Sequence, residues 1–186
     1  MDKSSNTIHQ QNGNNDINND DIIYQSKIIN TDNIIRFISD YLKNIIKINK
    51  DNHLKQSGIN NNDPLYNKKF PKLTIEKYLI RIKKYTEAEN NTIISALILI
   101  ERFIKKENYI IGLNNIYRIL LGCTVLAIKL LEDIKYDNSE YCQIGGLSLK
   151  DFNDIEYNLF IRLDFNINIS YKELEEIYQQ IQLFNI

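Results

Sequence analysis

The stretch IYRILLGCTVLAIKLLED at residues 116–133 is the feature that most constrains how this chain folds. A helix turns once in 3.6 residues, and at that period the apolar side chains of this stretch lie on nearly every side. Such a helix is stable in water only when other elements enclose it. The sequence therefore predicts a buried central helix with the rest of the domain packed around it.

Apolar residues at steps of three and four predict further helices along the chain. Thr74 is placed to cap one of them, Asn90 or Asn91 the next, and Ser148 together with Asp151 a later one. These segments predict an all-α fold, and 186 residues are enough for one domain with a single core. The predicted helices cover residues 32–49, 75–85, 90–107, 116–133, 138–144, 149–163 and a last segment that starts at 170.

Composition and motifs narrow the classes of function. The formal net charge of −1 does not favour nucleic acid as the main partner, because such binding depends on neutralising phosphates. The two cysteines, Cys123 and Cys142, and the two histidines, His9 and His53, fit no metal-ligand spacing, so both thiols are predicted to be buried and reduced. The sequence has no phosphate-binding glycine loop and no nucleophile close to a histidine. No cofactor, metal or catalytic activity is therefore expected.

The first 20 residues, MDKSSNTIHQQNGNNDINND, are rich in asparagine and nearly free of large apolar groups. Such a segment cannot offset the entropy of ordering, so it is predicted to be a disordered tail. It lacks the apolar core of a signal peptide, and no apolar run in the chain reaches the roughly 20 residues of a membrane span. An intracellular protein that does not bind membranes is expected.

Lys129 lies near the end of the apolar stretch, on the same helix stripe as Gly122. One interpretation is that its ammonium reaches water and pairs with Glu132 or Asp133, while Gly122 permits tight packing against a neighbouring backbone. The other is that Lys129 is the fixed cation of a partner-binding face. Glu156 lies one turn from an aromatic residue on the flank of the helix at 149–163. The same two interpretations apply to it: either its carboxylate faces water at the edge of the helix, or it contacts a partner.

Four strings resemble the cyclin box of the P-type and U-type cyclins, the group related to yeast phosphate-signalling cyclins. FPKLTIEKYLIRIKKY resembles the entry to the box, and ALILIERF resembles the end of its second helix. YRILLGCTVLAIKLLED resembles the third helix with its hallmark lysine, and YCQIGGLSLKDFNDIEYNLFIRLDF resembles the approach to the fifth helix and the helix itself. The resemblance implies a five-helix cyclin box at residues 70–167, with an N-terminal helix and loop at 21–69 and a C-terminal helix at 168–186.

By this resemblance, the chain is expected to be a regulatory subunit that binds and activates a cyclin-dependent Ser/Thr protein kinase. It would form a heterodimer with the kinase, in the nucleus or the cytoplasm, and would need no catalytic residue of its own. The interface lysine and the fifth-helix glutamate of the family correspond to Lys129 and Glu156. The neighbouring kinase-binding positions, which would pack on the C helix of the kinase, are Leu126, Leu130, Glu132, Phe160 and Phe165.

Two other functions remain open at this point. A scaffold that binds a kinase without activating it would have the same sequence features. A module like those of transcription factor IIB shares the helical design. That module normally uses two repeats and basic surfaces that face DNA, which a net charge of −1 does not supply.

Cell-cycle cyclins usually carry an arginine at the start of the first box helix, where it helps to recognise the phosphorylated activation segment of the kinase. This sequence has Leu73 and Thr74 in that region. We therefore expect activation that does not require the phosphate. Substituting the phosphosite of the kinase should lower the activity of the complex by less than about tenfold, measured with a peptide substrate. A larger loss would show that another basic residue takes the place of the arginine.

Overall fold

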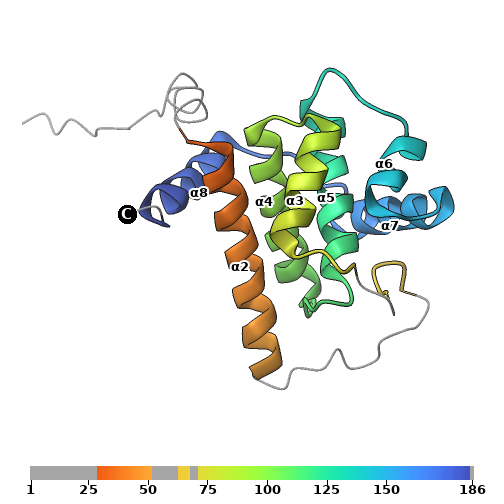
Figure 1. The fold of residues 1–186 in the computed structure, drawn as a ribbon, viewed down its shortest axis with the longest axis horizontal. Helices are drawn as coiled ribbons and strands as arrows, with labels where there is room; N and C mark the ends of the chain where they lie inside the picture. Colours follow the sequence, from red (N-terminus) through yellow and green to blue (C-terminus); the bar gives the residue numbers. More distant parts are fainter. Residues whose placement is uncertain (1–28, 52–62, 68–70, 185–186) are drawn as a thin grey trace, which may run out of the picture.

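A computed structural model describes residues 29–51, 63–67 and 71–184 (Figure 1). These residues form helices and no strand, which confirms the predicted all-α fold. The predicted tail at residues 1–20, and most of the loop predicted before residue 70, lie outside the described residues. The helices are α2 (Thr31–Asp51), α3 (Ile75–Thr86), α4 (Asn90–Glu107), α5 (Ile116–Leu131), α6 (Asn138–Gly145), α7 (Leu149–Arg162) and α8 (Tyr171–Phe184).

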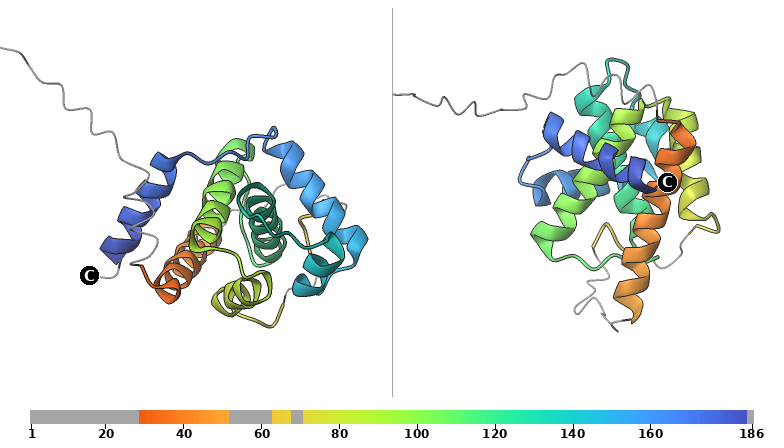
Figure 2. Two further views of the ribbon diagram at one scale, coloured as in Figure 1. Left: turned by 90° about the horizontal axis from the view of Figure 1, so that it is seen from above. Right: turned by 90° about the vertical axis from the view of Figure 1, so that its left-hand side faces the viewer.

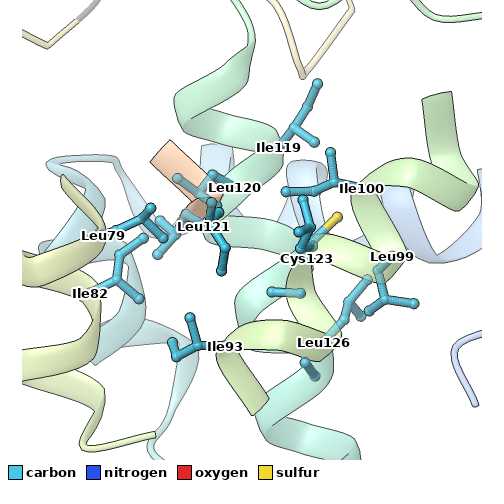
Figure 3. Close-up of a cluster of buried hydrophobic side chains, with 14 of the residues drawn as sticks. Leu79, Ile82, Ile93, Leu99, Ile100, Ile119, Leu120, Leu121, Cys123 and Leu126 are labelled. Atoms are coloured by element: carbon cyan, nitrogen blue, oxygen red, sulfur yellow. The ribbon is translucent and has the colours of Figure 1, made fainter. Parts of the chain in front are cut away.

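Helix α5 is the buried central helix that the sequence predicts. Every residue from Ile119 to Ile128 is buried, and α3, α4, α6 and α7 all pack against this helix. Figure 2 shows α2 and α8 on the other side of α4 from α7, so they flank the five helices of the core. Side chains of α5 meet those of α3 and α4 in the cluster drawn in Figure 3, which includes Leu79, Ile82, Leu99, Ile100, Leu120, Leu121 and Cys123.

Two asparagines at the start of α4 attach the flanking helices. The Asn90 side-chain oxygen accepts a hydrogen bond from the Thr31 hydroxyl of α2 at 3.0 Å. The Asn91 oxygen accepts one from the Tyr178 hydroxyl of α8 at 2.6 Å, and burial raises the pKa of Tyr178, so this hydroxyl stays a donor. The prediction that one of these asparagines caps α4 is wrong, because Glu89 occupies the N-cap position.

The other predicted caps are confirmed. The Thr74 hydroxyl accepts from the Lys77 amide at 3.2 Å and starts α3. The Ser148 hydroxyl accepts from the Asp151 amide at 3.1 Å and starts α7. Each cap satisfies an amide that the first turn of a helix leaves without an intrahelical partner.

Both cysteines are free and buried, as predicted. Burial raises the pKa of the Cys123 thiol in the centre of α5, because the thiolate would be desolvated there. The Cys142 thiol donates to the Ser139 carbonyl of its own helix at 3.2 Å. Cys123 is therefore a packing group and not a nucleophile.

Gly122 brings α5 and α7 into close contact. A Cβ at this position would overlap Cδ1 of Leu159 and would lie 3.0 Å from Cγ2 of Ile155. The space that the glycine leaves is thus filled by two side chains of α7, and not by a neighbouring backbone as expected from the sequence. The helix accepts a cost of about 1 kcal/mol in propensity for this contact.

Replacing Gly122 by valine should lower the free energy of unfolding by about 1–3 kcal/mol, because the added carbons overpack the contact with Leu159. Chemical denaturation measures the change. Gly122→Ala and Leu159→Ala should each destabilise the chain, whereas the double variant should lose less than the sum, since the new methyl group occupies part of the new cavity. Strictly additive losses would contradict this account.

Candidate functional site

The last turn of α5 emerges from the core beside α7 and opens onto a groove of about 470 Å³. Polar residues form one part of its lining, and apolar residues form the rest. The lining residues are Leu126, Lys129, Leu130, Asn138, Asn153, Glu156, Tyr157, Phe160 and Ile167. The structure therefore brings together Leu126, Lys129, Leu130, Glu156 and Phe160 of the predicted kinase-binding residues.

Lys129 is the centre of a polar network in the groove. Its ammonium lies 2.5 Å from Oε1 of Glu156 and donates to the side-chain oxygen of Asn138 at 2.8 Å. The Asn138 amide donates in turn to Oε2 of Glu156 at 2.7 Å and to the side-chain oxygen of Asn153 at 2.8 Å. The ionic partner of Lys129 is therefore on α7, and the interpretation that pairs Lys129 with Glu132 or Asp133 is wrong.

The network is only partly shielded from water. The Lys129 side chain is 36% exposed and the Glu156 side chain 16% exposed. Each charge has its counter-charge within the chain, so neither is left unpaired next to the core. The network can therefore persist in the free chain while the ammonium stays accessible from the groove.

Packing between α6 and α7 positions these polar groups. Asn138 is the first residue of α6, whose N-terminus has a capping box formed by Asp137 and Glu140. The buried Tyr141 ring of α6 lies 6.3 Å from the Phe152 ring of α7. These contacts hold the first residue of α6 against the middle of α7, so the Asn138 amide reaches both Lys129 and Glu156.

Aromatic residues extend the apolar part of the groove. The Phe160 ring of α7 lines the groove, and the Phe165 ring meets it edge to face at 4.9 Å between centroids. Phe165 itself is 59% exposed and lies beside the groove, outside its lining. Tyr157 is also exposed. Large apolar side chains that stay in contact with water next to a groove are typical of a surface that another molecule covers.

The sequence reasoning missed four lining residues: Asn138, Asn153, Tyr157 and Ile167. A signal for two of them existed, because Asn153 lies three residues before Glu156, and Tyr157 lies four residues after Asn153, at the spacings that bring helix residues onto one face. Asn138 starts a short helix, and Ile167 lies in the irregular segment after α7. No periodic pattern can place those two.

Glu132 lies outside the groove and has a different task. Its Oε1 accepts from the Glu89 amide at 2.8 Å and from the Thr92 hydroxyl. It therefore caps the N-terminus of α4, where a carboxylate also complements the helix dipole. A role of Glu132 in binding a kinase stays a prediction. Its carboxylate already accepts two hydrogen bonds within the chain.

The described residues show neither a metal site nor a membrane span. They contain no group of three or more histidine, cysteine or acidic residues that could hold a metal ion. Among the helices described, none has the length and the apolar character needed to cross a membrane.

Glu132→Ala should lower the free energy of unfolding by about 1 kcal/mol, because the Glu89 amide and the Thr92 hydroxyl lose their acceptor. Glu132→Gln should lose less, since an amide oxygen can still accept. Asp133→Ala, at the exposed neighbouring position, is the matched control and should leave stability within about 0.5 kcal/mol of wild type. Equal losses for Glu132→Ala and Asp133→Ala, measured by thermal and chemical denaturation, would exclude the capping role.

Comparisons with known proteins agree with this architecture. The model of the cyclin family, described as "Cyclin", matches residues 5–167. PHO85 cyclin-like protein psl1 of Schizosaccharomyces pombe is 29% identical over 158 residues, which cover 78% of this chain and 65% of the relative. PHO85 cyclin-7 of Saccharomyces cerevisiae is 30% identical over 167 residues, 78% of this chain and 59% of the relative.

A plant relative gives a similar result. Cyclin-U1-1 of Arabidopsis thaliana is 35% identical over 107 residues, which cover 56% of this chain and 50% of the relative. The chain thus spans between half and two thirds of the length of these curated relatives. Since the family model covers most of the chain, from residue 5 to the segment after α7, the protein belongs to the cyclin family.

Proposed function

We propose that this chain is the regulatory subunit of a cyclin-dependent Ser/Thr protein kinase, which it binds through the groove and activates by packing on the C helix of the kinase. The observation that supports this most is the combination of a fixed ion pair, Lys129 with Glu156, and exposed aromatic side chains on one surface. Two yeast relatives carry the name PHO85 cyclin or PHO85 cyclin-like protein. An intracellular location, in the nucleus or the cytoplasm, is part of the same proposal.

The physical argument concerns position. A protein kinase is active only when the glutamate of its C helix pairs with the lysine that holds the ATP phosphates. A rigid surface that covers the C helix can hold this arrangement, which the free kinase samples or loses as the helix moves. The catalytic groups then belong to the kinase, and this chain contributes only a surface.

The groove has the chemistry that a helix of another protein requires. Leu126, Leu130 and Phe160 offer apolar surface for the side chains of such a helix. An ammonium has three donors, and Glu156 and Asn138 engage Lys129 within the described chain. We expect the remaining donor of Lys129 to reach a carbonyl group of the partner, and we expect the carboxylate of Glu156 to accept from its amide or hydroxyl groups.

A scaffold that binds the kinase without activating it would use the same groove, so the experiment has to separate binding from activation. The chain, tagged and expressed in its own cells, is purified together with its partners, and kinases among them are identified by mass spectrometry. The purified kinase is then assayed with a peptide substrate with and without the chain. Binding with a rise in activity supports the proposal. Binding without a rise supports the scaffold, and the absence of any kinase overturns both.

Lys129→Ala should weaken binding to that kinase by about 2–5 kcal/mol, because it leaves a partner acceptor and Glu156 unpaired in the interface. Isothermal titration calorimetry measures the affinity, and the melting temperature reports whether the variant is folded. Phe160→Ala should also bind more weakly, through loss of apolar contact.

The matched control is Lys135→Ala, which removes an exposed lysine that does not line the groove. It should bind as the wild type does. If Lys129→Ala changes the melting temperature but binds the kinase with wild-type affinity, the network only holds α5, α6 and α7 together. The groove would then not be the kinase-binding surface.

A further inference from the structure

The turn between α7 and α8 has an unusual backbone. Asp164 and Phe165 are consecutive, neither is glycine, and both have positive φ angles, of 53° and 59°. A residue other than glycine in this region costs on the order of 1 kcal/mol and persists only where the surroundings enforce it. The turn carries the exposed Phe165 and, two residues later, Ile167 of the groove lining. Backbone hydrogen bonds hold the start of the turn against α7, among them the one from the Phe165 amide to the Phe160 carbonyl at 3.0 Å. The segment that follows Phe165 needs further contacts to stay in place.

Arg102 of α4 makes the contacts that hold this turn. Its Nη1 donates to the carbonyl of Asn166 at 2.6 Å and to the carbonyl of Asn168 at 3.1 Å, on either side of Ile167. Its Nη2 lies 2.6 Å from Oε1 of Glu173 in α8. Nη1 also donates to the Asn166 side-chain oxygen at 3.4 Å, so the guanidinium bonds to four acceptor atoms of three residues. The Arg102 side chain is only 19% exposed.

Glu173 is itself fixed in its charged form. Burial raises the pKa of this carboxyl, but hydrogen bonds from the Ser170 amide and hydroxyl and from Arg102 outweigh burial, and the pKa lies below its usual value. The pair of Arg102 with Glu173 is therefore charged at neutral pH. Together with Ser170 it anchors the far end of the segment to the first turn of α8.

Lys106, one turn further along α4, adds a weaker attachment. Its ammonium donates to the Arg162 carbonyl at 2.7 Å and lies 2.5 Å from Oδ2 of Asp164. The Asp164 side chain is 75% exposed, so this ion pair contributes little in water. Of these two side chains of α4, Arg102 therefore makes the stronger attachment to the turn.

We propose that Arg102 is a positioning residue for partner binding: it does not line the groove, but it fixes the turn that presents Phe165 and Ile167 at the end of the groove. This inference rests on the proposed function, since it assumes that a kinase covers the groove. Without the guanidinium, the carbonyls of Asn166 and Asn168 lose a donor and the turn is free to relax. A partner would then have to reorder it on binding, which lowers affinity without removing any contact.

The test compares three variants at two sites of α4. Arg102→Ala removes the guanidinium, and Arg102→Lys keeps the charge but not the planar fork that reaches Asn166, Asn168 and Glu173. Lys105→Ala removes an exposed neighbouring side chain as a control. The affinity is measured for the kinase that copurifies with the wild-type chain. Hydrogen–deuterium exchange is measured in the same samples at the amides of Asp164, Phe165 and Asn166, which donate to carbonyls at the end of α7.

Arg102→Ala should bind about tenfold more weakly, a factor that corresponds to about 1.4 kcal/mol. Its turn amides should exchange faster, while those of α5 stay protected. Arg102→Lys should fall between Arg102→Ala and the wild type in both measurements, which tests the positioning role even if Arg102→Ala unfolds. Lys105→Ala should match the wild type.

Wild-type affinity in Arg102→Ala would overturn the proposal, whether or not the turn exchanges faster. Weaker binding with unchanged exchange at the turn would also overturn it, because Arg102 would then act in some other way. If the wild-type chain binds no kinase at all, the proposed function fails and the positioning role for a partner falls with it. The two failures are distinguishable, because failure of the proposed function appears in the wild-type chain and failure of the positioning role appears only in Arg102→Ala.

Discussion

The enclosure of α5 is the constraint on which the rest of the structure depends. A helix that is apolar on nearly every side must be covered on every side, and α3, α4, α6 and α7 meet that requirement. The surrounding helices no longer enclose α5 where its sequence becomes polar. Lys129 and Leu130, in its last turn, are only partly buried, and the groove begins there. The place of the candidate site is thus a consequence of where the central helix stops being apolar.

The distance between α5 and α7 determines what the groove contains. Gly122 lets Leu159 and Ile155 pack against the backbone of α5, and Glu156 follows Ile155 directly in α7. At this close approach the Glu156 carboxylate reaches Lys129. The contact in the core and the ion pair in the groove therefore use adjacent residues of the same helix.

Helix α4 connects the core to the outer parts of the molecule at both of its ends. At its N-terminus, Asn90 and Asn91 bind α2 and α8, and Glu132 supplies the cap from the end of α5. Near its C-terminus, Arg102 binds the segment between α7 and α8. Side chains that hydrogen-bond to backbone groups of distant segments fix those segments more sharply than apolar contact does, because the bonds are directional. The same helix thus supports the groove without entering it.

The sequence by itself determined the helices, their order and the burial of α5, because apolar periodicity and local caps such as Thr74 and Ser148 involve residues only a few positions apart. The resemblance to cyclins also placed Lys129 and Glu156 in one site. Only the tertiary structure decided that these two residues bind each other and that Asn138 joins them. It also assigned the cap of α4 to Glu132, where local reasoning favoured the adjacent asparagines. Such partners lie far apart along the chain, and a periodic pattern records which face a residue occupies but not which distant side chain meets it there.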